Sequence, residues 1–205
     1  IQEEPRNTVT LILASASPRR SELLESAGIP FEKYTPSADE SSVTAANAKE
    51  LCLKRAELKA ECALEECTAA GKTDFVVLGA DTVVEKDGRV YGKPKDEREA
   101  REMLRSLSNA EHFVYTAVVM LASDGTGSKT VQRTGVTFKE YDEKLIEKYI
   151  ASRLCFGKAG AYGIQDEQLQ SFVLKTNGER DNVIGLPLNA VRRMLEEKEQ
   201  WLLWK

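Results

Sequence analysis

The chain has 205 residues, of which 41% are hydrophobic and 30% charged, and its formal net charge is −4. This length and composition predict a folded domain with a substantial core and exclude a polar low-complexity chain. The acidic balance argues against non-specific nucleic-acid binding, and no apolar run has the length of a membrane span or the form of a secretory signal, so we expect neither nucleic acid nor a membrane as partner.

The first predicted elements are a strand at 9–13 and a helix that begins at Pro18. The strand is β-branched and apolar, and Ser17 is placed to be the N-cap with Pro18 in the first helical position. A turn from a strand into a helix N-terminus presents free N–H groups to an anion. Arg19 and Arg20 add forked donors suited to phosphate oxygens. The turn therefore indicates a phosphate site, and a solvated basic helix face is the competing interpretation.

A predicted strand at 74–81 contains the strongly apolar run 75–80 and ends on a carboxylate, Asp81. A short strand at 31–35 and a long helix at about 44–70 precede it. An unpaired charge beside so apolar a run is costly. Asp81 is therefore a metal ligand, a catalytic base, or the N-cap of the next turn.

The later elements alternate between helices and hairpins. In chain order we expect a hairpin closed by Asp87-Gly88, a helix at 96–107, a hairpin of 112–122 and 130–139, a helix at about 142–151, a hairpin of 172–176 and 182–184 around Asn177-Gly178, and a helix from Pro187. The glycine-rich segment 157–165 has little propensity for regular structure, which suits close approach to a ligand. The pattern predicts an α/β fold with a mixed twisted sheet flanked by helices, as a single domain over residues 1–205.

Cysteine and histidine usage limits the metal chemistry. The four cysteines show no CxxC pair, which favours reduced structural thiols. His112 is the one histidine of the chain, so a site with several histidines is excluded. Carboxylates must then hold any divalent cation, which suits Mg²⁺ or Mn²⁺ better than zinc.

Several candidate groups converge if ligands gather beyond the carboxyl ends of the strands. The turn at 15–20 and Asp81 then share one edge of the sheet, and Gly92 and Pro94 fix the position of Lys93. Taken alone, Lys93 and Glu40 are most simply solvated surface charges. Together with the two arginines they form the set that Mg²⁺-dependent attack on a polyphosphate requires, since cations neutralise phosphate charge and a carboxylate activates water.

Five segments in order along the chain carry a family resemblance: 13–24, 79–83, 92–94, 158–165 and 183–187. They read Leu-Ala-Ser-Ala-Ser-Pro-Arg-Arg-Ser-Glu-Leu-Leu, Gly-Ala-Asp-Thr-Val, Gly-Lys-Pro, Lys-Ala-Gly-Ala-Tyr-Gly-Ile-Gln and Val-Ile-Gly-Leu-Pro. This set resembles the Maf family of nucleoside triphosphate pyrophosphatases. The resemblance implies a Maf/ITPase-like fold with a central nucleotide cleft, hydrolysis of a nucleoside triphosphate to monophosphate and pyrophosphate with a divalent metal cation, a cytoplasmic house-cleaning role, and a homodimer.

The resemblance also implies roles for single positions. Asp81 resembles the family's proton acceptor, and with Lys93 and Glu40 it would form the catalytic group, Glu40 and Asp81 also holding the metal. The triphosphate-binding set would be Ser15, Arg19, Arg20 and Lys93. The positions linked with nucleotide choice would be Arg19, Thr82 and Gln165. The late loop is similar to that of the branch acting on dTTP and UTP, and a glutamine amide can pair with the carbonyl and N3–H edge of a pyrimidine.

Two other functions compete with this interpretation. A nucleotidyltransferase also holds a triphosphate at a turn after its first strand, but that turn is usually rich in glycine, whereas this one has serines and a proline. A nucleotide-binding regulator of cell division, a role associated with the Maf family, would need no turnover. Asp81 and Lys93 favour an enzyme, because a binding protein needs no base beside the phosphates.

Overall fold

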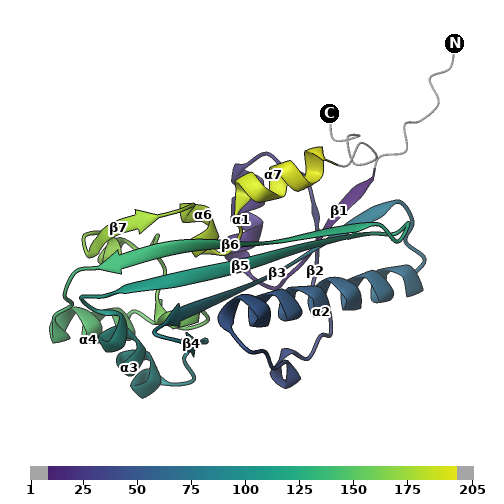
Figure 1. Cartoon of the computed structure of the whole chain (residues 1–205). Coiled ribbons are helices and arrows are strands. Elements are labelled where there is room, and N and C mark those ends of the chain that lie inside the picture. The colour runs from purple at the N-terminus through teal and green to yellow at the C-terminus, as the bar shows by residue number, and fades with distance from the viewer. Residues whose placement is uncertain (1–8, 198–205) are drawn as a thin grey trace, which may run out of the picture.

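The computed structural model describes residues 9–197, which form a seven-stranded mixed sheet with helices on both faces (Figure 1). The strands are β1 (Thr10–Ala14), β2 (Glu32–Tyr34), β3 (Phe75–Lys86), β4 (Arg89–Tyr91), β5 (Glu111–Ala122), β6 (Gly127–Phe138) and β7 (Val173–Asn177). The helices are α1 (Pro18–Ser26), α2 (Ala48–Ala69), α3 (Glu97–Leu107), α4 (Glu143–Ala151), α5 (Glu167–Gln170), α6 (Arg180–Ile184) and α7 (Leu188–Glu196), with 3-10 turns η1 (Glu40–Ser42) and η2 (Ala159–Ala161).

The sheet has the order β2-β1-β3-β5-β6-β7, with β4 paired to β3. β1 runs parallel to β2 and β3, and the other pairs are antiparallel. The predicted mixed sheet flanked by helices is therefore confirmed. No helix among the described residues has the length and apolar character needed to cross a membrane.

Side chains of the central strands alternate between two cores. Leu11 and Leu13 of β1 pack with residues of α1 and α7, whereas Ile12 and Ala14 pack with residues of α2. This alternation is the period of two that a strand covered on both faces requires. A third core gathers α3, α4 and η2 around the ends of β3, β5 and β6, with Tyr149 completely buried. This third core supports the glycine-rich segment 157–165.

Helix α2 lies close against β3 because small residues face the strand. Its buried positions are Ala48, Cys52, Ala56, Ala60, Ala63 and Cys67. On the strand side, a Cβ at Gly79 would lie 2.6 Å from the Ala56 carbonyl oxygen and 2.9 Å from the Ala60 Cβ. The absence of a side chain at Gly79 thus sets the distance between the two elements, and the next residues of β3 lie directly beside the helix.

Most predicted elements are present, and two expectations are wrong. The expected strand at 182–184 is part of helix α6, because after β7 the chain turns at Gly178, with φ +126°, and Asn182 buries its side chain against β5 and β6. Asp81 does not end its strand, because the β-branched residues that follow extend β3 to Lys86 in an unbroken ladder with β5. The cysteines are free thiols, as predicted.

Candidate active site

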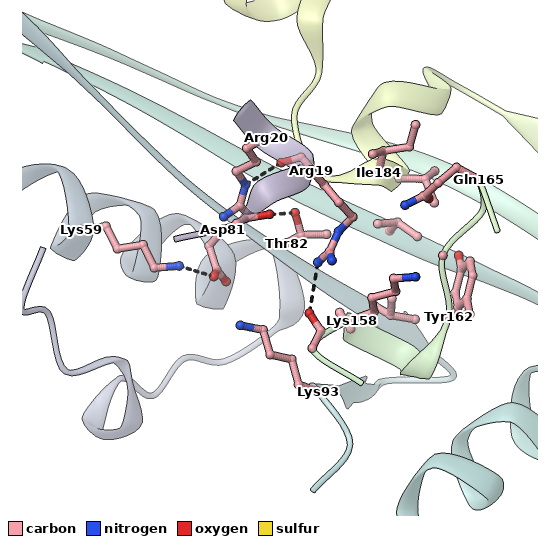
Figure 2. Close-up of a pocket in the computed structure, with 18 residues that line it drawn as sticks. Arg19, Arg20, Lys59, Asp81, Thr82, Lys93, Lys158, Tyr162, Gln165 and Ile184 are labelled. Atoms are coloured by element: carbon pink, nitrogen blue, oxygen red, sulfur yellow. Dashed lines mark hydrogen bonds and ion pairs between the residues drawn. The ribbon is translucent and has the colours of Figure 1, made fainter. Parts of the chain in front are cut away.

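A cleft of about 640 Å³, including its open mouth, lies between α1, β3 and the segment 157–165 (Figure 2). A second hollow of about 810 Å³ adjoins it and shares Arg19, Arg20, Lys59 and Lys93 with it. Every site residue predicted from the sequence lines one or both hollows. The first holds Arg19, Arg20, Asp81, Thr82, Lys93 and Gln165, and the second adds Ser15 and Glu40.

Asp81 reaches the cleft although it lies inside a strand. The parallel neighbour β1 ends at Ala14, which pairs with Gly79. Asp81 is therefore just beyond the carboxyl end of the parallel pair, where α/β sheets place their ligands. Because β3 continues past it, the role of an N-cap for a following turn is excluded.

Lys59 of α2 joins the two predicted catalytic carboxylates. Its Nζ lies 2.8 Å from Asp81 Oδ1 and 2.9 Å from Glu40 Oε2, and it also donates to the Ala80 carbonyl at 3.3 Å. The Asp81 side chain is only 10% exposed, and its Oδ2 atom is buried with no hydrogen-bond partner. Desolvation raises the pKa of Asp81, while the charges of Lys59 and Arg20 oppose that rise. Asp81 is therefore a buried carboxylate with one oxygen free to accept a proton or to bind a cation.

The two carboxylates fit a hard divalent cation. Asp81 Oδ1 and Glu40 Oε2 both contact Lys59 Nζ. The distance between these two oxygens therefore cannot exceed the sum of the two contact distances. Mg²⁺ is usually held by one or two carboxylates together with substrate phosphates and water. Residues 9–197 contain no group of three or more His, Cys, Asp or Glu side chains that could hold a metal alone. A cation here would thus need phosphate oxygens to complete its shell.

Arg20 is buried and uses three N–H groups on the protein. Its Nε donates to the Gly185 carbonyl at 2.8 Å, Nη1 to Ser15 Oγ at 3.2 Å and Nη2 to Thr82 Oγ1 at 3.2 Å. Gly185 has a φ of +135°, a backbone conformation that disfavours any side chain. Two of the five guanidinium N–H groups stay available for a ligand. Arg20 therefore joins the α1 turn, β3 and the segment after α6 at one point.

The hydrogen bonds of the neighbouring Thr116 leave the Thr82 hydroxyl only the role of an acceptor toward the cleft. Thr116 Oγ1 donates its single hydrogen to the Asn182 carbonyl at 2.8 Å. The Thr82–Thr116 hydrogen bond of 2.9 Å must then use the hydrogen of Thr82. Thr82 Oγ1 accepts from Arg20 and keeps one lone pair. A ligand group that meets this oxygen must be a donor.

Arg19 and Lys93 form the more open part of the cleft. Arg19 Nη2 donates to the Gly157 carbonyl at 3.0 Å, which links α1 to the glycine-rich segment. The Gly160 amide donates to the Gly92 carbonyl at 3.0 Å, so the same segment also fixes the turn before Lys93. Lys93 is exposed, and no residue of the described chain pairs with its ammonium group. The α1 N-terminus has no side-chain cap, so Ser17 occupies the predicted N-cap position without capping the helix.

Gln165 lies at the opposite side of the cleft from Asp81 (Figure 2). Its Oε1 atom is buried without a partner. Tyr162 and Ile184 lie near it in Figure 2, and the same cleft is also lined by Val84, Val114, Ala159 and Val183. The site therefore has a cationic end around Arg20 and Lys93 and a second end where apolar side chains surround the Gln165 amide and the Lys158 ammonium.

Two cleft lysines were not predicted. Lys59 lies in a helix rich in Lys and Glu, where the sequence makes it one solvated charge among many. Its position between Ala56 and Ala60, which belong to the buried stripe of α2, is the signal that could have found it. Lys158 lies inside a recognised motif, but its burial, with 8% of the residue exposed, depends on a tertiary contact to Asp166.

The chain is similar to known proteins over most of its length. The family model described as Maf-like protein matches residues 10–198. The chain is 41% identical over 197 residues to a dTTP/UTP pyrophosphatase of Bacillus cereus, covering 96% of this chain and 94% of that relative. It is also 41% identical over 187 residues to a dTTP/UTP pyrophosphatase of Bacillus thuringiensis subsp. konkukian, covering 91% and 94%. The structure of the Staphylococcus aureus Ham1 protein aligns with 92% of this chain and 100% of that one, at 14% identity and a TM-score of 0.48.

Proposed function

The chain belongs to the Maf-like protein family, and from this premise we propose that it is a nucleoside triphosphate diphosphatase that hydrolyses dTTP and UTP to the monophosphate and pyrophosphate. One observation carries the proposal. Asp81 presents a buried, unpartnered carboxylate oxygen in a cleft whose cationic end holds Arg19, Arg20 and Lys93. A carboxylate base beside a set of phosphate-binding cations is the arrangement that water attack on a phosphoanhydride needs.

The triphosphate binds at the cationic end. The uncapped N-terminus of α1 offers backbone N–H groups and a partial positive charge, and the two arginines begin the same helix. The remaining N–H groups of Arg20 and the unpaired ammonium of Lys93 add charge-assisted donors. Ser15, whose Oγ already accepts from Arg20 and from the Ser17 amide, orients the turn around the phosphates.

Asp81 accepts the proton of the attacking water. The water oxygen then forms a bond to the α-phosphorus, and the bond from that phosphorus to the bridging oxygen breaks, so that pyrophosphate leaves with the electron pair. Lys59 donates to Asp81 Oδ1, and Asp81 Oδ2 has no hydrogen-bond partner in the protein, so the carboxylate keeps lone pairs for a ligand. A Mg²⁺ or Mn²⁺ ion held by Glu40 and Asp81 would withdraw charge from the phosphate oxygens during this attack.

The base lies at the second end of the cleft, beside Gln165. The amide can donate to a carbonyl and accept from N3–H of uracil or thymine, and its Oε1 has no partner in the protein. Arg19 and Thr82 would contact the nucleotide between the base and the phosphates, where the Thr82 oxygen accepts. We propose a cytoplasmic house-cleaning role and a homodimer as further parts of this function, both implied by the family.

Product analysis tests the proposal. The protein is incubated with each common nucleoside triphosphate and Mg²⁺ or Mn²⁺, and monophosphate, diphosphate, phosphate and pyrophosphate are separated. We expect pyrophosphate with dTMP or UMP in equal amounts, and less turnover of purine nucleotides. Release of inorganic phosphate with a diphosphate would contradict the proposal, because attack would then be at the γ-phosphorus.

A further inference from the structure

Lys158 is a buried cation of the cleft wall that the proposed reaction does not use. It lies near the start of segment 157–165, which carries Gln165, and its Nζ lies 2.5 Å from Oδ2 of Asp166, the residue that follows this segment. The two side chains are 10% and 8% exposed. Burying two charges costs several kcal/mol each unless geometry and further hydrogen bonds compensate. A buried pair beside a ligand cleft therefore needs an explanation.

The surroundings hold this ammonium in one place. Asp166 Oδ2 also accepts from the Tyr149 hydroxyl, which in turn accepts from the Gly163 amide. A Cβ at Gly163 would lie 2.7 Å from Asp166 Oδ2 and 2.8 Å from Lys158 Nζ, so this glycine makes room for the pair. Lys158 is thus held by a carboxylate that is itself fixed by Tyr149, unlike the exposed Lys93.

The fixed ammonium has donors left over, and they lie at the base end. Asp166 takes one of its three N–H groups, and within residues 9–197 the other two have no hydrogen-bond partner. In Figure 2 the Lys158 ammonium points away from Asp81 and Lys93, toward the side of Tyr162 and Gln165. The Gln165 amide supplies one donor and one acceptor, and the Lys158 ammonium supplies a further donor. Together they offer a ligand a donor, an acceptor and a donor.

We propose that Lys158 is a further specificity-determining residue that donates to the 4-carbonyl oxygen of a uracil or thymine base, beside Gln165. This inference rests on the proposed function and names the base edge that is read. Uracil and thymine present acceptor, donor and acceptor along that edge, which matches an amide plus a lysine. Cytosine places an amino donor at position 4, where it would face the Lys158 ammonium without an acceptor. Asp166 and Tyr149 are positioning residues, because they act only through Lys158.

Thio-substituted substrates test the contact without changing the protein. Sulfur accepts hydrogen bonds weakly, so 4-thio-dUTP keeps N3–H but loses most of the contact to Lys158, and 2-thio-dUTP is the matched control at the other carbonyl. Hydrogen bonds to charged groups are strong enough for a loss of about tenfold or more in kcat/KM. We expect that loss for 4-thio-dUTP relative to dUTP, and a clearly smaller loss for 2-thio-dUTP. Equal kcat/KM for dUTP and 4-thio-dUTP would overturn the inference.

The variant Lys158→Met then distinguishes a contact with the base from a purely structural role of the ion pair. We expect its ratio of dUTP to 4-thio-dUTP turnover to fall to near one, whereas Lys93→Met should slow both substrates by the same factor. Lys175→Met, a change at an exposed lysine of β7, should alter neither. A merely structural ion pair would slow all substrates equally and leave the ratio unchanged, which would overturn the inference.

A second variant serves as the control for loss of folding. Lys158→Met/Asp166→Asn removes both charges, so no unpaired charge stays buried, and its thermal unfolding is compared with that of the wild type. The ratio must fall in this variant as well. If the wild type hydrolyses no pyrimidine triphosphate, the proposed function fails and this inference with it; if the wild type is active and the ratio does not change, only this inference fails.

Discussion

The apolar strand β3 can hold the Asp81 carboxylate because two cations, Lys59 and Arg20, stabilise its charge. Lys59 contacts one oxygen at 2.8 Å, and Arg20 is the next cation that lowers the pKa of Asp81. Burial acts in the opposite direction and is the larger effect, so the pKa of this carboxyl is above its ordinary value. A base with a raised pKa is a stronger proton acceptor than a solvated aspartate, provided that the solution is alkaline enough to keep it ionised.

Asp81→Asn tests the base directly. The amide has nearly the same shape but cannot take a proton from water, so we expect kcat to fall by about 10²–10⁴-fold. Nucleotide affinity should change far less, because Arg19, Arg20 and Lys93 remain. Steady-state kinetics measure the first effect, and calorimetric titration with a non-hydrolysable triphosphate analogue measures the second. Turnover within a few-fold of the wild type would remove Asp81 from this role.

Lys59→Met should move the acid limb of the pH–rate profile to higher pH. The charge and hydrogen bond of Lys59 lower the pKa of Asp81, so their loss lets burial raise it further. Activity needs the ionised carboxylate and therefore falls as the pH drops through that pKa. The measurement is kcat/KM against pH, with Lys59→Arg as the control that keeps the charge. A midpoint that stays in place or moves to lower pH in the methionine variant would contradict this role for Lys59.

At the scale of elements, the packing of α2 against β3 brings a helix side chain to the catalytic strand. Lys59 can reach Asp81 and the Ala80 carbonyl because α2 presents Ala56 and Ala60 to a strand that has Gly79 there. A larger residue at any of these positions would separate the helix from the strand. The close approach is therefore part of the site as well as of the core.

Gly79→Ala should cost both stability and activity. The new Cβ would lie 2.6 Å from the Ala56 carbonyl oxygen, a backbone atom that cannot rotate away. Overpacking of this kind typically costs about 1–3 kcal/mol. Urea unfolding measures the stability, and the kcat of the folded variant reports the displaced Lys59. Gly92→Ala serves as the stability control, since a Cβ there meets nothing within 4 Å; equal unfolding free energies for the two variants would contradict the argument.

The sequence predicts those elements that depend on neighbouring residues, and it fails for those that depend on contacts between distant residues. The strand periods, the Asp87-Gly88 hairpin and the helix starts at Asp96 and Asp142 are local, and the structure confirms them. Segment 182–184 is β-branched enough to indicate a strand, yet the buried hydrogen bonds of Asn182 to Val114 and Thr134 hold it as a helix. Local propensity could not predict that outcome, because both partners are more than forty residues away.

The site residues divide in the same way. The motif positions lie together in the cleft, as the family resemblance implies. Lys59 and Lys158 were not predicted because a tertiary contact sets each apart: Asp81 and Glu40 for the first, and Asp166 for the second. The one local signal is the place of Lys59 beside the buried alanines of α2.

At the scale of the whole molecule, a buried chain of hydrogen bonds connects the phosphate end of the cleft to helix α6. Arg20 donates to Thr82, Thr82 to Thr116, and Thr116 to the Asn182 carbonyl, across β3, β5 and α6. Buried hydrogen-bond networks that are satisfied make a core specific, because any shift leaves a polar group unpaired. This chain fixes the segment that ends at Gly185 and returns to Arg20.

A second buried polar contact, between His112 and Tyr162, ties the central sheet to the base end of the cleft. His112 is completely buried, its Nε2 lies 2.7 Å from the Tyr162 hydroxyl, and its ring packs against Phe138. Burial lowers the pKa of His112 from 6.5 to about 4. The folded protein therefore holds this histidine neutral at pH values where the unfolded chain protonates it.

His112→Phe should weaken the loss of stability in mild acid. For the wild type, the contribution of His112 is present above pH 6.5 and is lost as the pH falls from 6.5 toward 4, because only the unfolded state gains the proton in that window. Between pH 7 and pH 5 this one group removes about 2 kcal/mol. Urea unfolding at both pH values measures the difference, which should shrink by that amount in the variant. Tyr162→Phe is the control, because it keeps the imidazole and should keep the wild-type pH dependence. If His112→Phe and the wild type showed equal pH dependence of stability, His112 would not be its source.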